Sequence, residues 1–308
     1  MKTYDVLIVG AGPAGLLSAY LLRKKGISCI ILEQKSNVKN KVCGDGLTVN
    51  SVKELLALGI DVREIPGKKI IKKYSIFDGI KKEEYYKDIF NFPYAYGISR
   101  NLFDEFLLDK CKALSVDLIF NHKCKNIRKE SDSYIIDGEF LANKVIIASG
   151  ASSNFAITNK KPKDLPLGMS SRIKALLNYS DQAFYFIENK NSKKGYAWIF
   201  PVADGIWNIG VWSSEEIFKR NIKEMYYSFE KEILGDGKFA YDRLPAGAFI
   251  GASKEINTIK NFEKNKYYVG DCTYKANFYS GEGILNAIID ARNVTNSILG
   301  IDDELWKF

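Results

Sequence analysis

Residues 5–15 read DVLIVGAGPAG, an apolar strand that runs into the pattern GxGxxG. An amphipathic helix follows, and a second apolar strand, residues 29–32, ends on Glu33. Glycine clusters alone are common in turns, but these follow a strand, open a helix and precede an acidic residue in the expected order. The pattern therefore predicts a βαβ unit that binds a dinucleotide.

Each residue of the glycine turn has a predicted role in holding the cofactor. Gly10 makes the tight turn, Gly12 lets the backbone approach a pyrophosphate, and Gly15 lets helix and strand pack closely. Pro13 and Ala14 open the helix, whose free N–H groups and partial positive charge face the phosphates.

The acidic residue after the second strand bears on the choice of nucleotide. Glu33 can accept hydrogen bonds from both ribose hydroxyls of an adenosine, and its charge would repel a 2′-phosphate, which disfavours NADP. We expect the neighbouring Gln34 and Lys35 to contact the cofactor as well. Gly150, the single glycine of a later apolar segment, suits contact with the adenosine half.

Length and composition are typical of an ordinary globular protein. The 308 residues exceed what one core usually supports, so we expect a large domain with a smaller companion. The hydrophobic content of 46% and charged content of 27% are those of a soluble chain. We find no apolar run of about 18 residues and no signal-peptide cleavage region, and we expect a cytoplasmic protein with at most peripheral membrane contact.

The net charge of +8 is spread over scattered lysine pairs such as Lys24-Lys25 and Lys81-Lys82. No compact basic run with interleaved aromatic residues marks a nucleic-acid surface. A solvated lysine-rich surface explains the charge, with weak attraction to an acidic substrate or membrane as the alternative. The five cysteines form no CxxC pair and His122 is the single histidine, so we predict neither a disulfide framework nor a metal site.

A second signal lies near the other end of the chain, where a strand ends in Gly270-Asp271 before a loop and a long helix. Asp271 can accept bonds from ribityl or phosphate-proximal hydroxyls. The helix opens on Gly281, Gly283 and Ile284, and its positive end would face the flavin edge that becomes anionic on reduction. Together with the first motif, this favours FAD over a nicotinamide.

The segments divide into two kinds, and we predict an α/β fold in which an antiparallel-sheet (α+β) substrate domain is inserted into a Rossmann-like FAD-binding domain. Strands with aromatic residues and intervening turns are expected at residues 171–177, 183–187, 196–200 and 207–212. The FAD-binding domain is assigned residues 1–65, 95–155 and 262–308, and the substrate domain residues 66–94 and 156–261.

Arg100 stands at a predicted strand-to-helix junction. A guanidinium there can bond a pyrophosphate or the flavin edge. The alternative is a surface arginine paired with Asp104 one turn further on.

Together these motifs resemble flavoproteins of the p-hydroxybenzoate hydroxylase type. Within that group, KVCGDGL at residues 41–47, GYAWIFP at 195–201 and SGEGI at 280–284 resemble motifs of the geranylgeranyl reductase family. The resemblance covers nearly the whole chain. It implies reduction of isolated carbon–carbon double bonds by hydride transfer from reduced flavin, with an apolar, isoprenoid-like substrate.

Such a reaction needs an acid to protonate the second alkene carbon. Cys43 can be that acid or a flavin-side contact, and Gly44 beside it permits close approach to the ring. The alternative for Cys43 is a small buried apolar residue. Tyr279, just before the long helix, is a second candidate as donor or lid.

Tyr196, Trp198 and Phe200 alternate, so they share one face of a strand. With Phe278 they are predicted to wall a substrate channel above the flavin, although aromatic stripes also occur as plain core. An aromatic monooxygenase using NAD(P)H and oxygen stays open on the same architecture. So does a non-catalytic flavin-binding partner or sensor.

The source of electrons is open as well. No second strand–GxGxxG–helix unit is present, so we expect a transiently bound NAD(P)H or a reduced ferredoxin or flavodoxin. The positive net charge would suit an acidic redox protein.

Overall fold

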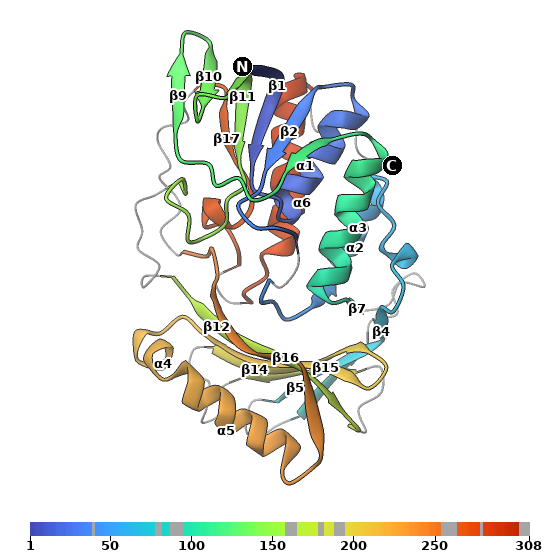
Figure 1. Cartoon of the computed structure of the whole chain (residues 1–308). Helices are drawn as coiled ribbons and strands as arrows, with labels where there is room; N and C mark the ends of the chain where they lie inside the picture. Colours follow the sequence, from blue (N-terminus) through green and yellow to red (C-terminus); the bar gives the residue numbers. More distant parts are fainter. Residues whose placement is uncertain are drawn as a thin grey trace.

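A computed structural model describes residues 1–38, 41–77, 82–86, 95–157, 165–177, 182–187, 195–253, 264–277 and 280–301. In Figure 1 a sheet backed by helices stands above a second sheet, which lies across its lower end. Parallel strands with helices in one unit and a separate sheet in the other confirm the predicted α/β class.

The upper sheet has the strand order β8-β2-β1-β11-β10-β9, with β17 paired to the free edge of β11. Its parallel members pair in register through their apolar residues, as Ile8 does with Ile31 and Ile146. They are β1 (Lys2–Val9), β2 (Cys29–Leu32), β8 (Asp117–Ile119), β11 (Phe140–Ile147) and β17 (Lys266–Tyr268). The antiparallel members are β9 (Ile127–Glu130) and β10 (Ser133–Ile136). The strand centres are buried on both faces, which explains their continuous apolar sequence.

Helices cover one face of this sheet (Figure 1). They are α1 (Pro13–Lys24), α2 (Val49–Ala57), α3 (Arg100–Ala113) and α6 (Ile284–Leu299), and a short turn, η1 (Val62–Glu64), follows α2. Their apolar sides and alternate residues of β1 and β2 form one core, whereas the other residues of these strands pack with Tyr134 and Phe140 on the opposite face. α6 ends at Gly300, which has the left-handed φ of 65° expected of a C-terminal cap. None of the helices in the described part of the chain is long and apolar enough to cross a bilayer.

The lower sheet has the order β16-β12-β15-β14-β13-β5-β6. Its strands are β5 (Lys73–Phe77), β6 (Lys82–Tyr86), β12 (Leu167–Ala175), β13 (Gln182–Ile187), β14 (Gly195–Ala203), β15 (Ile206–Ser213) and β16 (Phe239–Phe249). The predicted antiparallel sheet is confirmed, with one exception in that β5 and β13 pair in parallel. β16 was not predicted, since its mostly half-exposed residues show no clean alternation.

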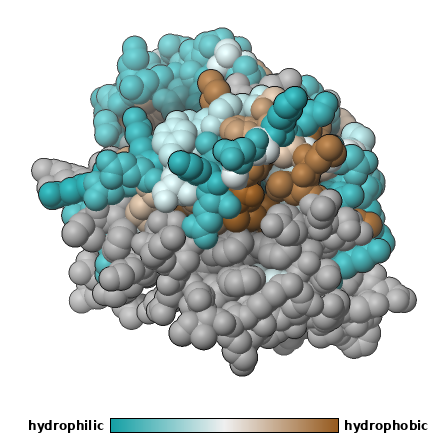
Figure 2. All heavy atoms as spheres, turned by 90° about the horizontal axis from the view of Figure 1, so that it is seen from below, coloured by the Kyte–Doolittle hydropathy of each residue, from teal (hydrophilic) through white to brown (hydrophobic). Residues whose placement is uncertain are grey.

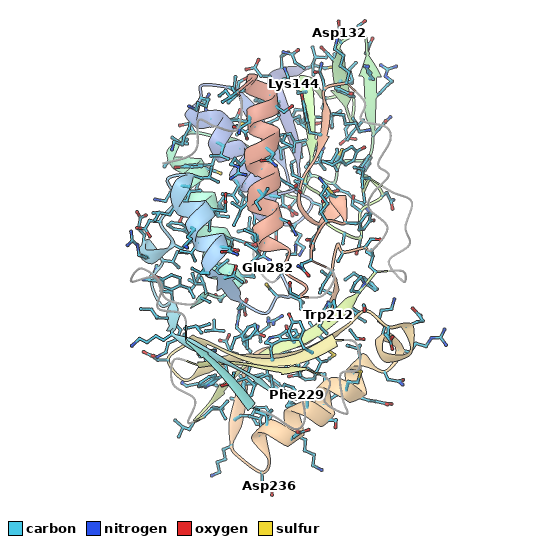
Figure 3. All side chains as sticks on the ribbon, turned by 180° about the vertical axis from the view of Figure 1, so that it is seen from behind. Asp132, Lys144, Trp212, Phe229, Asp236 and Glu282 are labelled. Carbon is cyan, nitrogen blue, oxygen red and sulfur yellow. The ribbon has the colours of Figure 1, made fainter. Side chains whose placement is uncertain are left out.

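The two faces of the lower sheet differ. α5 (Ile222–Leu234), preceded by α4 (Glu216–Arg220), packs on the face away from the upper domain, where Phe229 belongs to one buried core with Ala197 and Ile199. Figure 3 places Phe229 on that side and Trp212 on the side that faces α6. Seen from below, the described surface of this unit is mainly hydrophilic, with a smaller apolar area beside it (Figure 2).

A small sheet joins the two units. β7 (Ala95–Gly97) lies between β3 (Gly46–Thr48) and β4 (Lys69–Ile71). The chain therefore passes into the lower sheet between Ile71 and Lys73 rather than at the expected boundary of residue 66. A Cβ at Gly97 would overlap the Pro201 carbonyl, so the two units touch backbone to backbone there.

Candidate functional site

The glycine turn between β1 and α1 forms an open cradle. Gly10 has φ of 108°, and a Cβ at Gly15 would overlap the Gly10 carbonyl oxygen. A Cβ at Gly12 would meet nothing within 4 Å, so the backbone at the start of α1 faces free space. Gly12 caps α1 without a side-chain bond, and Pro13 takes the first turn, where its missing N–H costs nothing. The N-terminus of α1 is thereby left available to an anion.

Glu33 closes the side of this cradle. Its Oε2 accepts a hydrogen bond from the Ala11 N–H at 2.8 Å, and its Oε1 accepts one from the Lys35 N–H at 2.8 Å. Glu33, Gln34, Lys35 and Gly150 line a cleft of about 790 Å³ beside the turn. His122 also lines it and lies 2.9 Å from the Asp137 carboxylate.

A second cavity, the central cavity, has a volume of about 170 Å³ and lies between the two units. It shares Gly12, Lys41, Gly150 and Asp271 with the cleft, so the two spaces meet at the start of α1. Three parts of the fold enclose it: the loop before β3, the N-terminus of α6 and the upper face of the lower sheet. The predicted residues along it are Pro13, Ala14, Cys43, Gly44, Arg100, Tyr196, Trp198, Phe200, Gly281, Gly283 and Ile284.

The N-terminus of α6 is the second helix end at this cavity. Gly283 caps α6 without a side-chain bond, and a Cβ there would lie 2.8 Å from the Asp271 carboxylate. Asp271 belongs to the short helix η4 (Gly270–Thr273), and its Oδ2 is 3.7 Å from the Lys41 ammonium. Glu282 fixes this end of α6, since its carboxylate accepts a hydrogen bond of 2.5 Å from the Thr48 hydroxyl. Figure 3 shows Glu282 at the lower end of α6, above the sheet that carries Trp212.

Arg100 is buried and paired with Asp104, through Nε at 2.9 Å and Nη2 at 2.8 Å. The alternative pairing is therefore present, but in the interior rather than on the surface. Burial alone would lower the pKa of Arg100, but Asp104 and the Cys43 side chain raise it above its usual range. The side chain lines the central cavity as a fixed positive charge.

Cys43 is the one cysteine of five that is not buried, and all five lie in described residues. Burial raises the pKa of the thiols of Cys29, Cys111, Cys124 and Cys272 to about 12. Those four are small core residues, as the sequence suggested for Cys29 and Cys111. Cys43 instead lines the cavity, beside the Arg100 guanidinium.

The aromatic face of β14 forms the floor of the cavity. The rings of Trp198 and Phe200 stack with their centroids 6.1 Å apart. The ring centroid of Tyr196 lies 5.7 Å from that of Trp212 on β15. A Cβ at Gly44 would lie 3.4 Å from Phe200 and 3.5 Å from Trp198, so the loop passes directly over these rings. The Tyr196 hydroxyl donates to the Ser280 carbonyl at 2.5 Å and ties the floor to the approach of α6.

Two predicted residues, Phe278 and Tyr279, lie outside the described residues. Four others line or support the cavity without having been predicted: Lys41, Trp212, Asp45 and Asn208. Trp212 faces Tyr196 across the β14–β15 ladder, so the alternation of β15 was a signal that could have found it. Asp45 and Asn208 carry no local signal, because their contacts come from distant strands.

Comparisons with known proteins place this geometry among flavoproteins. Residues 3–137 match the sequence family described as an FAD binding domain. The digeranylgeranylglycerophospholipid reductase of Methanosarcina mazei is 26% identical over 306 residues, covering 92% of this chain and 72% of the relative. The chain is thus similar to FAD-binding proteins in its first half and to a named reductase over 92% of its length.

Solved structures share its fold. A geranylgeranyl bacteriochlorophyll reductase-like protein from Thermoplasma acidophilum aligns with a TM-score of 0.80 at 20% identity, over 97% of this chain and 78% of the other. The p-nitrophenol 4-monooxygenase of Pseudomonas putida aligns with a TM-score of 0.74 at 18% identity, over 97% and 80%. The fold is thus common to reductases and hydroxylases, and it does not by itself select the reaction.

The described residues fit FAD. The open space above Gly12, the uncapped helix ends at Gly12 and Gly283 and the joined spaces beside Glu33 and Asp271 suit an extended dinucleotide. Glu33 would hold the adenosine ribose, the start of α1 the diphosphate and Asp271 the ribityl chain. Lys41 bridges the two spaces and adds a positive charge beside them.

Proposed function

We propose that this enzyme reduces carbon–carbon double bonds of an apolar, isoprenoid-like lipid. The observation that carries the proposal is the composition of the central cavity. It joins the cofactor cradle to an aromatic floor, and Cys43 is the accessible thiol along it. The relative's name, digeranylgeranylglycerophospholipid reductase, supports the same class of substrate.

The aromatic floor suits a hydrocarbon chain. Trp198, Phe200 and Trp212 are almost fully buried and offer flat apolar surfaces to the cavity. Such walls favour an apolar ligand through the area they cover and set its orientation through ring contacts. They also exclude water from the reacting carbon atoms.

The chemistry requires a hydride and a proton. When bound, reduced FAD supplies the hydride that adds to one alkene carbon. Cys43 donates its S–H proton to the other carbon, so the double bond becomes a single bond with two new C–H bonds. The thiolate left behind is stabilised by the adjacent Arg100 guanidinium and regains a proton from solvent.

Each turnover would consume two electrons and a proton from an external donor. We propose a transiently bound NAD(P)H or a reduced ferredoxin or flavodoxin as the donor. The lysines around the cleft, Lys35, Lys41, Lys123 and Lys125, favour an acidic redox protein.

The experiment uses FAD-loaded, full-length chain, reduced chemically under argon and mixed with geranylgeranyl lipid. We expect products heavier by two mass units for each double bond reduced. Cys43→Ala should slow this at least about tenfold, and Cys43→Ser should keep part of the rate because a hydroxyl can still donate. Cys111→Ala is the matched control, since Cys111 is buried away from the cavity.

Other outcomes separate the competing functions. Products heavier by one oxygen atom that form only in air would indicate the monooxygenase instead. Firm FAD binding without turnover of any alkene or aromatic compound would indicate a non-catalytic flavin-binding protein. Full activity of Cys43→Ala would remove Cys43 from the proton transfer but leave the reductase assignment in place.

A further inference from the structure

The backbone carbonyl of Cys43 is held by three donors from the lower sheet. Asn208 Nδ2 on β15 donates to it at 2.8 Å, Ser170 Oγ on β12 at 3.2 Å and Arg243 Nη2 on β16 at 3.4 Å. Arg243 also donates to Ser170 Oγ at 2.8 Å, so the donors support one another. A loop carbonyl with three side-chain donors is far more tightly placed than one that faces solvent.

Asn208 is the centre of this arrangement. It is fully buried, and its Oδ1 accepts the indole N–H of Trp198 at 2.8 Å. Its Nδ2 donates to the Asp45 carboxylate at 2.8 Å as well as to the Cys43 carbonyl. One amide therefore contacts both the loop that carries the thiol and the ring that forms the floor.

The contacts of Asp45 explain why position 208 carries an amide side chain. It is 2% exposed and has φ of 60°, and its Oδ1 accepts the Arg100 N–H at 2.9 Å. The guanidinium of Arg172 lies 3.5 Å from its Oδ2. Without the Asn208 N–H, this buried carboxylate would lose its 2.8 Å hydrogen bond and keep only the more distant Arg172 guanidinium at Oδ2, and a lost hydrogen bond to a buried charge is costly.

We propose that Asn208 is a positioning residue that fixes the Cys43 thiol relative to the Trp198 ring. A substrate double bond lying on the Trp198 ring would then lie at a fixed distance from the Cys43 thiol. The kinetic part of this inference rests on the proposed alkene reduction. The positional part does not, because it concerns only the loop and the ring.

The test measures the accessibility of the thiol directly. Cys43 is the one unburied cysteine, so iodoacetamide and peptide mass analysis report its environment separately from the other four. Asn208→Leu, of similar volume, should change the alkylation rate of Cys43 at least about threefold. The four buried cysteines should stay unreactive, and the FAD dissociation constant should stay within about twofold.

Two further variants keep the inference testable if Asn208→Leu does not fold. Ser170→Ala removes one of the three donors and should shift Cys43 alkylation in the same direction by a smaller factor. Ile209→Val is the matched control, since Ile209 neighbours Asn208 on β15 but packs toward α5. In the kinetic arm, Asn208→Leu should lower kcat about tenfold with little change in KM, and Ile209→Val should leave both unchanged.

Unchanged Cys43 alkylation in both Asn208→Leu and Ser170→Ala would overturn the inference. So would a rise in the reactivity of all five cysteines in both variants, which would show a merely structural role. If alkylation shifts as expected while no alkene is reduced by the wild type, the positional role stands and the proposed reaction fails.

Discussion

The cradle at the start of α1 and the clamp on the Cys43 carbonyl both fix a short loop beside the cofactor, but by opposite means. The cradle is built mainly from the backbone of residues 10–15, with the Glu33 side chain at its side and Ala148 packed against Gly10 and Gly15. The clamp is built from side chains that stand 127, 165 and 200 residues away from Cys43 along the chain. The first is a local property of the sequence, and the second exists only after both units have folded and met.

This difference has a consequence for mutation. A backbone cradle fails when a side chain is added where two segments approach closely, as they do at Gly15. A side-chain clamp fails when a donor is removed, and its partners are then left unpaired in the interior. The cradle should therefore govern folding and FAD binding, and the clamp should govern turnover.

The largest effect is expected for Gly15→Ala. The new methyl group would overlap the Gly10 carbonyl oxygen, which is backbone and cannot move aside cheaply. We expect a loss of about 3 kcal/mol in the free energy of unfolding together with loss of FAD binding. Urea unfolding measures the free energy of unfolding, and FAD titration measures FAD binding. Gly12→Ala is the control, because its methyl would enter open space, so stability should hold while FAD affinity falls. Equal stability of Gly15→Ala and wild type would contradict this account of the turn.

Gly210→Ala tests the other region with a similar change. Gly210 faces Trp198 across the ladder, and a Cβ there would overlap the indole ring. We expect the ring to shift, alkene reduction to fall about tenfold and stability to fall by about 1–3 kcal/mol, with FAD still bound. Gly205→Ala, where a Cβ meets nothing within 4 Å, should leave turnover unchanged despite its φ of 67°. A defect in FAD binding, rather than in turnover, would erase the proposed division between the regions.

Glu33→Gln tests whether the Glu33 carboxylate of the cradle contributes to FAD binding. The carboxylate accepts from two backbone N–H groups, and removing its charge weakens those bonds and any bond to a ribose. We expect FAD affinity to fall about tenfold, corresponding to about 1.4 kcal/mol. Fluorescence titration of the flavin measures it, with the exposed Glu139→Gln as the control. Unaltered affinity would show that Glu33 serves the turn alone.

The smallest effect is expected at Asp137, beside the adenosine cleft. Burial alone would raise the pKa of Asp137, but the bonds from His122 and the N–H groups of Lys125 and Asn126 lower it. A lowered pKa in the folded state stabilises the fold above the unfolded value of about 3.9, and this is lost as the pH falls through the folded value. Asparagine tolerates the φ of 52°, and its amide oxygen can still accept from the N–H groups of Lys125 and Asn126, so Asp137→Asn should cost less than about 1 kcal/mol at pH 7. Urea unfolding should show the difference shrinking below about pH 3.9, and a constant difference would contradict the assignment.

Much of the fold could be predicted because its signals are local. The spacing of Gly10, Gly12, Gly15 and Glu33 specifies a strand, a turn, a helix and a second strand without reference to the rest of the chain. The alternation of Tyr196, Trp198 and Phe200 likewise indicates one face of a strand, and that face does line the cavity.

Other features depend on contacts that no local pattern encodes. The parallel pairing of β5 with β13 joins segments about a hundred residues apart, and its register leaves no local mark in either one. Asp45 sits in a glycine-rich loop that reads as solvent-exposed, yet it is buried because Asn208 and Arg172 arrive from the lower sheet. Arg100 was linked to the right partner by helical spacing, but its burial depends on the loop that carries Cys43.

The backbone contact between Gly97 and Pro201 limits how the cavity can open. No side chain separates the two units at that point, and a second backbone contact follows β16, where a Cβ at Gly251 would overlap the Asp271 carbonyl oxygen. The Ala276 N–H also donates to the Gly251 carbonyl at 2.9 Å, so the β16 side of the cavity is attached to the upper unit as well. Two separate attachments resist a rotation of one unit against the other, and access to the cavity would therefore depend on movement of the side chains that line it rather than on a hinge.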